Sequence, residues 1–489
     1  MANTPAHVCP LAKKCGGCQL QNLSYDEQLH LKQATAIRLL GRFGHVEEII
    51  GMKDPYHYRN KVQAAFGVNR QGQIISGVYQ SASHRIVPVS DCMIEDTVAD
   101  QIIVTIRGLL KSFKIRPYDE DTGRGTLRHV LVRRGWRSGE ILVVLVTAHG
   151  MLPGKRNFVR ALLQRHPDIT TIVQNINAGQ TSLVLGPHSE VLYGPGYIRE
   201  QLGDFTFRIS PRAFYQINPV QTEVLYRTAL DYAGLTGKET VVDAYCGTGT
   251  IGIFASRNAA RVIGVENNRD AVRDAISNAK ANRADNVRFY TADASDFLQG
   301  MAMAGEHADV IILDPPRAGS DERFLAAVTA VGPERVVYVS CNPETLARDL
   351  GYLTRHGYRV TRIQPVDMFP HTEHIETVVL LSHKKADSYI HIDVEFGEGE
   401  GKIPVDSIAK RAEAYKPKEK VTYKMIKEYI EAKYGFKVHT AYIAEVKRNL
   451  GLPMYDAPNA VEELKQPRKH PTPEKVEAIK DALRYFAVI

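Results

Sequence analysis

The sequence predicts an α/β protein whose main domain contains a mostly parallel sheet, and three observations support this fold class. Strand patterns alternate with helical patterns from residue 205 to residue 384, which is typical of a parallel sheet. Residues 53–204 instead show short strands broken by glycine and proline, which is typical of an antiparallel-rich domain. The 489 residues also exceed what one hydrophobic core holds, so we expect several domains.

The domain order follows from these changes of pattern. Residues 1–23 form a cysteine-rich segment. Residues 24–52 hold a helix that begins with a capping box at Ser24 and Glu27 and extends to about Phe43. We expect this helix to pack on the α/β domain. The β-rich domain of residues 53–204 has expected strands at 61–68, 74–79, 126–133, 140–147 and 182–185. Residues 205–384 form the α/β domain. Residues 385–489 form a helical extension with helices expected at 405–415, 422–434, 440–450 and 473–485, of which the first three resemble a helix-turn-helix.

The extension is also where the net charge of +7 gathers. From Lys402 to Ile489 there are 18 Lys and Arg against 12 Asp and Glu, on an almost neutral body. A basic extension of this kind favours a polyanionic binding partner, and the alternative is that the extension is a docking module for another protein.

In the β-rich domain, basic residues interleaved with aromatics, as in Tyr58-Arg59-Asn60-Lys61, are suited to bind phosphates and to stack on RNA bases.

No apolar run approaches the roughly 18 residues of a membrane span. The first residues also lack the basic-then-apolar pattern of a signal peptide. We therefore expect a cytoplasmic protein without a membrane partner.

Four of the six cysteines have the spacing of a metal site. Five residues separate Cys9 from Cys15, two separate Cys15 from Cys18, and Cys92 follows much later. Four thiolates bind either zinc or an iron–sulfur cluster. Zinc sites usually pair two cysteine knuckles, and Cys92 has no neighbouring cysteine, so the spacing favours iron–sulfur over zinc or over four unrelated thiols.

A glycine-rich turn predicts a nucleoside cofactor in the α/β domain. The segment Tyr245-Cys246-Gly247-Thr248-Gly249-Thr250 leads from an apolar strand into a helix, and Glu266 ends the next strand. One carboxylate at that place binds both ribose hydroxyls. The turn is not G-x-G-x-x-G, which favours S-adenosylmethionine over a dinucleotide. Asp293, after a third strand, is placed to bind the adenine amino group.

Cys341 and Glu376 are the candidate catalytic residues. Cys341 lies just past the strand of residues 335–339, and Glu376 begins a later strand. The loop Asp314-Pro315-Pro316-Arg317 resembles loops that cradle a flat base beside a methyl donor. A thiol that adds to C6 of a pyrimidine makes C5 nucleophilic, and a carboxylate then removes the C5 proton. The pair therefore predicts methylation of carbon 5 of a pyrimidine.

From about Cys9 to Leu381 the chain resembles the RNA uracil-5-methyltransferase family, in the iron–sulfur branch that makes 5-methyluridine in large-subunit (23S) ribosomal RNA. The resemblance rests on the motifs above together with residues 214–218 and 374–376. It implies a Rossmann-like domain with a seven-stranded sheet, Cys341 as nucleophile and Glu376 as base. It further implies contacts to S-adenosylmethionine from Gln216, Tyr245, Glu266 and Asp314, and a 4Fe–4S cluster on Cys9, Cys15, Cys18 and Cys92.

Three other functions fit part of these residues. Formation of 5-methyluridine in tRNA and methylation of cytosine C5 use the same thiol addition, and a non-catalytic iron–sulfur RNA-binding factor would use the cysteines alone. Many relatives also carry a small β-barrel before the first cysteine, whereas only eight residues precede Cys9. We therefore expect the C-terminal extension to replace that barrel in RNA binding.

Overall fold

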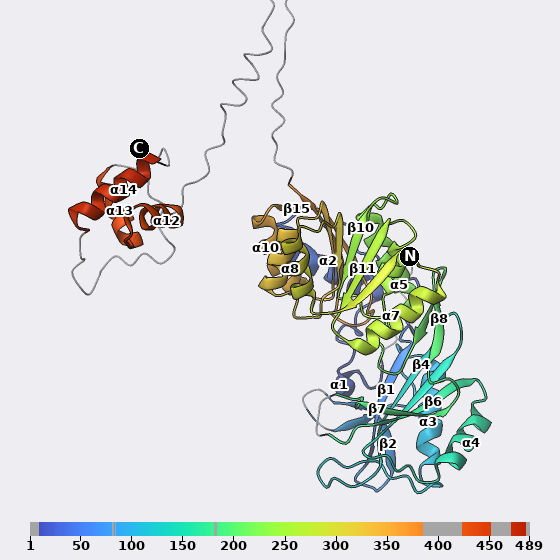
Figure 1. Ribbon diagram of the computed structural model, residues 1–489. Coiled ribbons are helices and arrows are strands. Elements are labelled where there is room, and N and C mark those ends of the chain that lie inside the picture. Colours follow the sequence, from blue (N-terminus) through green and yellow to red (C-terminus); the bar gives the residue numbers. More distant parts are fainter. Residues whose placement is uncertain are drawn as a thin grey trace, which may run out of the picture. The chain divides into compact units, whose positions relative to one another are not determined.

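The computed structural model describes residues 9–80, 83, 85–179, 183–384, 423–450 and 471–485. The chain divides into two compact units, residues 1–389 and residues 390–489 (Figure 1). Within the described ranges, no helix is both long and apolar enough to cross a membrane.

The α/β domain is built on a seven-stranded sheet with the strand order β12-β11-β10-β13-β14-β16-β15. Neighbours from β12 to β14 run parallel, whereas β16 runs antiparallel to both β14 and β15. The predicted seven-stranded, mostly parallel sheet is therefore confirmed. The strands are β10 (Thr240–Ala244), β11 (Arg261–Glu266), β12 (Val287–Thr291), β13 (Val310–Leu313), β14 (Arg335–Ser340), β15 (Tyr358–Val366) and β16 (Glu376–His383).

Helices cover both faces of this sheet, so its central strands are apolar on both sides. Alternate residues of one strand enter different cores: Val241 packs in the core that contains α5, and Val242 in the core that contains α2, α8, α9 and α10. The helices are α2 (Tyr25–Leu40), α5 (Pro219–Ala233), α6 (Thr250–Ala255), α7 (Arg269–Ala281), α8 (Ala294–Ala304), α9 (Glu322–Val331) and α10 (Pro343–Arg355).

Helix α2 comes from the segment before the β-rich domain yet packs on the α/β domain. Its predicted capping box is present, because Ser24 accepts from the Glu27 amide and the Glu27 carboxylate accepts from the Ser24 amide at 2.8 Å. The helix ends at Leu40, three residues before the expected end. Ala36 and Leu40 are fully buried in the core shared with α10, which places α2 beside the carboxyl end of β14.

The β-rich domain has its own seven-stranded sheet with the order β3-β2-β1-β4-β5-β6-β7. All neighbours are antiparallel except β5 and β6, which α4 (Lys155–Arg165) connects. Helix α3 (Thr97–Leu109) packs on the same sheet. The strands are β1 (Lys61–Val68), β2 (Ile74–Tyr79), β3 (Ile86–Pro88), β4 (Leu127–Arg134), β5 (Ile141–Thr147), β6 (Ile169–Ile176) and β7 (His188–Tyr193), followed by a hairpin of β8 (Ile198–Leu202) and β9 (Phe205–Ile209).

One strand predicted for this domain is wrong. Residues 183–185 form no strand, residue 182 lies outside the described residues, and β7 begins only at His188. The side-chain amide of Asn177 donates to the carbonyls of Leu183 and Val184 at 2.7 and 3.1 Å. These local bonds satisfy carbonyls that a strand would pair with a neighbour.

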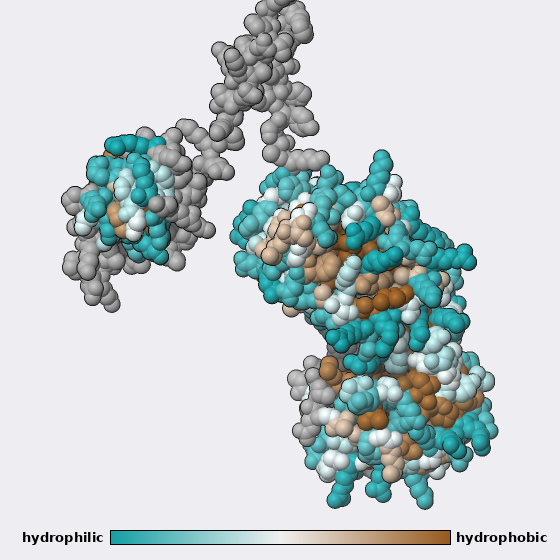
Figure 2. Space-filling view, in the orientation of Figure 1, coloured by the Kyte–Doolittle hydropathy of each residue, from teal (hydrophilic) through white to brown (hydrophobic). Residues whose placement is uncertain are grey.

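The C-terminal unit contains α12 (Tyr423–Tyr434), α13 (Thr440–Asn449) and α14 (Pro473–Tyr485), close to three of the predicted helices. The fourth, at 405–415, lies outside the described residues. The three helices share a core around Ile430, Ile443 and Ile479. Figure 2 shows hydrophilic residues over most of the visible face of these helices, as expected when their apolar residues gather inside. The helix-turn-helix assignment stays a prediction.

Candidate active site

A cavity of about 610 Å³ opens at the carboxyl ends of β10, β11, β13 and β14. This edge is where open α/β sheets bind their ligands. Six of the predicted site residues line the cavity together: Gln216, Tyr245, Glu266, Asp314, Cys341 and Glu376. The fold thus brings the predicted cofactor turn, the thiol and the carboxylate to one place.

The turn after β10 has the left-handed backbone conformation that its glycines predict. Gly247 and Gly249 have φ of 54° and 79°, and Tyr245 shares the left-handed region at 63°. A Cβ on Gly249 would lie 2.6 Å from Phe289, so that position has no room for a side chain. Glu266 accepts from the Gly247 amide at 3.1 Å, which fixes the carboxylate against the turn.

Asp293 is the one predicted cofactor residue that does not line this cavity. Its carboxylate accepts from the backbone of Ser295 and Asp296 and so caps α8. It also pairs with Arg323 at 2.8 Å, on an exposed surface. To reach an adenine, Asp293 would have to give up this partner.

Cys341 is held at the end of β14 by hydrogen bonds on both sides of it. The Ser340 hydroxyl donates to the carbonyl of Asn342 at 3.1 Å, and the Asn342 amide side chain donates to the carbonyl of Arg317 at 3.1 Å. Asn342 also caps α10. The loop that carries the thiol is therefore tied to the Asp314-Pro315-Pro316-Arg317 loop.

The thiol lies among acidic groups. Burial, then the nearby Glu376 and Asp314, raises the pKa of Cys341 to about 11, and Arg317 opposes this rise. Burial, and then Asp314, holds the pKa of Glu376 well above its usual range. Burial likewise raises the pKa of Asp314. At neutral pH the free site therefore holds a proton on the thiol, and burial shifts both carboxyl groups toward their protonated forms.

The loop before Glu376 is anchored on α2 by a buried ion pair that sequence reasoning missed. Lys32 Nζ lies 2.6 Å from Asp367, with side chains 1% and 0% exposed, and also donates to the carbonyl of Phe369 at 3.1 Å. Tyr25 donates to the other Asp367 oxygen at 2.8 Å. The available signal was that Lys32, Ala36 and Leu40 follow one another at four-residue intervals, which places them on one face of a helix.

The four predicted metal-binding cysteines are free thiols in one region of the fold. Burial, then Cys15 and Cys9, raises the pKa of Cys18 to about 11. Cys18 and Cys92 pack on the same small core of Met52, Tyr58 and Ile94. Among the described residues, however, no three His, Cys, Asp or Glu side chains converge well enough to hold a metal ion.

The cysteine segment contacts the loop that leads to Glu376. Leu20 donates its amide to the carbonyl of His371 at 3.0 Å, and the Tyr58 hydroxyl donates to the carbonyl of Pro370 at 3.0 Å. His371 has a φ of 69°, and its amide donates to Gln28 of α2 at 2.8 Å. The loop is therefore held from both sides.

The Tyr58-Arg59-Asn60-Lys61 motif joins the two larger domains rather than forming an open surface. Tyr58 and Asn60 are 1% and 3% exposed, so Tyr58 cannot stack on a base. The Asn60 amide donates to the carbonyl of Ile217 at 2.9 Å, next to the cavity residue Gln216. Burial, then Arg133, lowers the pKa of Lys61 to about 8, which marks a partly buried basic pair.

Three comparisons with known proteins bear on this site. Residues 188–384 match the sequence profile of the family described as tRNA (uracil-5-)-methyltransferase. An uncharacterized RNA methyltransferase of Halalkalibacterium halodurans is 47% identical over 381 residues, which cover 77% of this chain and 83% of that protein. One of Clostridium tetani is 44% identical over 386 residues, covering 78% and 84%.

A solved structure is similar to most of this chain. The Pyrococcus abyssi tRNA (uracil-54, C5)-methyltransferase in complex with S-adenosyl-L-homocysteine superposes with a TM-score of 0.63 and 30% identity. The superposition covers 75% of this chain and 85% of that one.

Proposed function

Because the chain belongs to the tRNA (uracil-5-)-methyltransferase family and is an S-adenosylmethionine-dependent RNA methyltransferase, we propose that it methylates carbon 5 of a uridine in RNA. One observation carries the choice of chemistry. Cys341 and Glu376 line the same cavity as the cofactor turn, which supports a reaction in which the thiol, the carboxylate and the methyl donor act on one pyrimidine ring.

The reaction balances with these two side chains. The Cys341 thiol releases its proton to solvent and forms a bond from Sγ to C6 of the uracil, and the electrons of the C5–C6 double bond move toward C5 and the C4 carbonyl to give an enolate. C5 then takes the methyl group as its bond to the sulfonium sulfur breaks, leaving S-adenosylhomocysteine. Glu376 accepts the C5 proton, and the electrons of that C–H bond expel the Cys341 thiolate.

The acidic surroundings of Cys341 suit a cationic methyl donor. The free site keeps the thiol protonated, because burial and two carboxyl groups disfavour its anion. A sulfonium bound in this cavity would add a positive charge, which would lower the pKa of the thiol and of both carboxyl groups. Donor binding would thus favour the thiolate of Cys341 and the ionised form of Glu376 before the RNA reacts.

We assign large-subunit ribosomal RNA as the substrate, and tRNA is the second candidate. The ribosomal assignment rests on the four-cysteine set of the iron–sulfur branch. The tRNA candidate rests on the likeness to the Pyrococcus abyssi enzyme, which is named for tRNA uracil 54. The C-terminal unit supplies an additional contact for either RNA in this proposal, with a protein partner as the alternative.

By residue type the same four cysteines suit a 4Fe–4S cluster, although their side chains, all among the described residues, do not converge on one metal position in this structure. Cys9 and Cys15 act electrostatically on Cys18, and Cys92 packs on the same small core, so four sulfur donors share one region. The Nε of Arg59 is buried without a hydrogen-bond partner among the described residues, and its charge opposes the rise in the Cys18 pKa. An anionic cluster bound there would give this guanidinium a further negative partner beside Glu95.

The test uses ribosomal RNA fragments and tRNA that carry 5-fluorouridine, with Cys341→Ala as the control. Fluorine cannot leave as a proton, so the methylated covalent adduct accumulates and survives denaturing electrophoresis. We expect an adduct whose peptide contains Cys341, and the RNA that forms it identifies the substrate class. Mass spectrometry of nucleosides from unmodified RNA separates 5-methyluridine from 5-methylcytidine. RNA binding without any adduct would favour a non-catalytic binding factor.

A further inference from the structure

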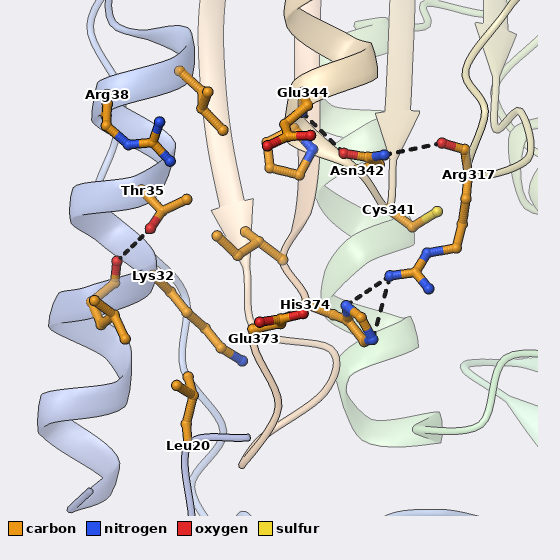
Figure 3. A pocket seen from close by; sticks show the side chains of 14 residues that line it. Leu20, Lys32, Thr35, Arg38, Arg317, Cys341, Asn342, Glu344, Glu373 and His374 are labelled. Carbon is orange, nitrogen blue, oxygen red and sulfur yellow. Dashed lines mark hydrogen bonds between the residues drawn. The ribbon is translucent and has the colours of Figure 1, made fainter. Parts of the chain in front are cut away.

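A second cavity, of about 440 Å³, lies next to Cys341 on the side of α2 (Figure 3). One wall is the face of α2 that carries Leu31, Thr35 and Arg38. The opposite wall comes from the start of α10, including Asn342 and Glu344, and from the residues just before β16. Its volume is within the range of pockets that bind small organic ligands.

The two cavities share a partition. Arg317, Cys341 and His374 line both of them, and Arg317 lies 2.7 Å from the Nδ1 of His374. The target base must lie beside Cys341 in the cofactor cavity, because Glu266 and Glu376 are there. An RNA chain continues on either side of that base, so a neighbouring nucleotide is within reach of the second cavity.

The chemistry of the second cavity suits a nucleotide. Arg38 has no acidic partner within the described part of the chain, and Figure 3 shows it extending from α2 toward the opposite wall. A free guanidinium binds phosphate well. Glu344 and Glu373 line the cavity and can accept from base N–H groups, while Leu20, Leu31 and Ile375 offer apolar contact to a base.

The walls are rigid enough to make this site specific. Helix α2 is fixed to the loop before Glu376 by the buried Lys32–Asp367 pair at 2.6 Å. The Asn342 side chain ties the start of α10 to Arg317 at 3.1 Å. A ligand in the cavity would therefore contact preformed walls and lose little free energy to their ordering.

We propose that this second cavity binds the nucleotide adjacent to the target uridine. Its base lies between α2 and the start of α10, and its phosphate lies at Arg38. The two carboxylates favour a base with an amino group, namely adenine, guanine or cytosine, over uracil. This inference rests on the proposed function, because it assumes that an RNA strand passes Cys341.

The experiment uses whichever RNA forms the 5-fluorouridine adduct with the wild-type protein. In two derivatives of that RNA, the nucleotide before or after the 5-fluorouridine is replaced by an abasic residue. Adduct formation is timed at RNA concentrations below saturation for the wild type, Arg38→Glu and Thr35→Trp, which fills the cavity. The matched control is Arg355→Glu, an exposed arginine at the opposite end of α10.

We expect one abasic replacement, but not the other, to slow the wild type and Arg355→Glu by about tenfold or more, the effect of losing one stacked base. Thr35→Trp should be slow on intact RNA and show no further loss with that replacement. Arg38→Glu should be slow on intact RNA and bind S-adenosylmethionine normally. Equal abasic effects in all four proteins would overturn the inference while leaving the proposed function standing. No adduct from wild-type protein with any RNA would overturn both.

Discussion

The reactivity of Cys341 should depend on pH in a way that differs from that of an ordinary thiol. Only the thiolate is alkylated, and burial together with Glu376 and Asp314 raises the pKa of Cys341 to about 11. Raising the pH of the protein without donor should therefore increase the alkylation rate far beyond pH 9. The sign follows from the cause, because each of these three effects disfavours the anion.

The size of the effect follows from that pKa. The thiolate fraction of Cys341 should be about one in a thousand at pH 8, about one in a hundred at pH 9 and about one in ten at pH 10. The rate should therefore rise about tenfold for each pH unit over this range. A thiol with the unshifted value of 9.0 would already be half ionised at pH 9 and would gain less than twofold above it.

The assay is timed alkylation with iodoacetamide, read by mass spectrometry of the peptide that contains Cys341. Cys341→Ser supplies the background, and the intact mass reports reaction at the other cysteines. A rate that levels off by pH 9 would refute the reasoning, since it would mean that the carboxyl groups and burial do not act on this thiol.

The bound donor provides a second perturbation of the same thiol. S-adenosylmethionine carries a positive sulfonium, whereas S-adenosylhomocysteine has a neutral sulfur and nearly the same shape. The alkylation midpoint should therefore lie at lower pH with S-adenosylmethionine than with S-adenosylhomocysteine. Equal midpoints would contradict a role for the sulfonium charge in preparing Cys341.

Four further predictions follow from other contacts. Glu376→Gln should lower turnover by about 10²- to 10⁴-fold and accumulate a methylated adduct on natural uridine, which denaturing electrophoresis detects. Glu266→Ala should weaken S-adenosylmethionine binding by about tenfold or more in calorimetry, through loss of charge-assisted hydrogen bonds. Lys32→Met should destabilise the α/β domain by about 3–5 kcal/mol in urea, because Asp367 stays buried without its partner, and Lys32→Met/Asp367→Leu should recover much of this. Removal of residues 390–489 should weaken RNA binding in a filter assay and leave S-adenosylmethionine affinity unchanged, because they form a separate unit.

Several site residues could be located from sequence because their signals are local. Gly247 and Gly249 adopt positive φ in a turn between a buried strand and a helix. Glycine is the residue that adopts positive φ most easily, so a few neighbouring residues are enough to predict this turn. Cys341 and Glu376 each sit at the end of a strand whose apolar run is visible in the sequence. Parallel strands bring their carboxyl ends to one edge, so strand position predicted that Cys341 would lie there. Glu376 reaches the same edge because β16 runs antiparallel to β14 and begins where β14 ends.

Contacts between distant segments could not be predicted in this way. Asp293 caps α8 and pairs with Arg323, a partner from another loop that the sequence did not indicate, and its contact with the adenine stays a prediction. Tyr58 was expected on an RNA-binding surface but is buried between domains. Whether a polar residue faces solvent or a partner depends on which elements pack over it. Neither the residue type nor the residues adjacent in sequence determine this packing.

By itself, the sequence determined the fold class, the order of the strands along the chain and the residue types at the carboxyl edge of the sheet, because periodicity and turn chemistry act over a few residues. Tertiary structure alone decided that Lys32 meets Asp367 across the fold, that acidic groups surround the Cys341 thiol, and that α2 and the start of α10 enclose a second cavity beside it. The physical reason is that burial and electrostatic interactions depend on distance in space, which the fold sets between residues far apart in the chain.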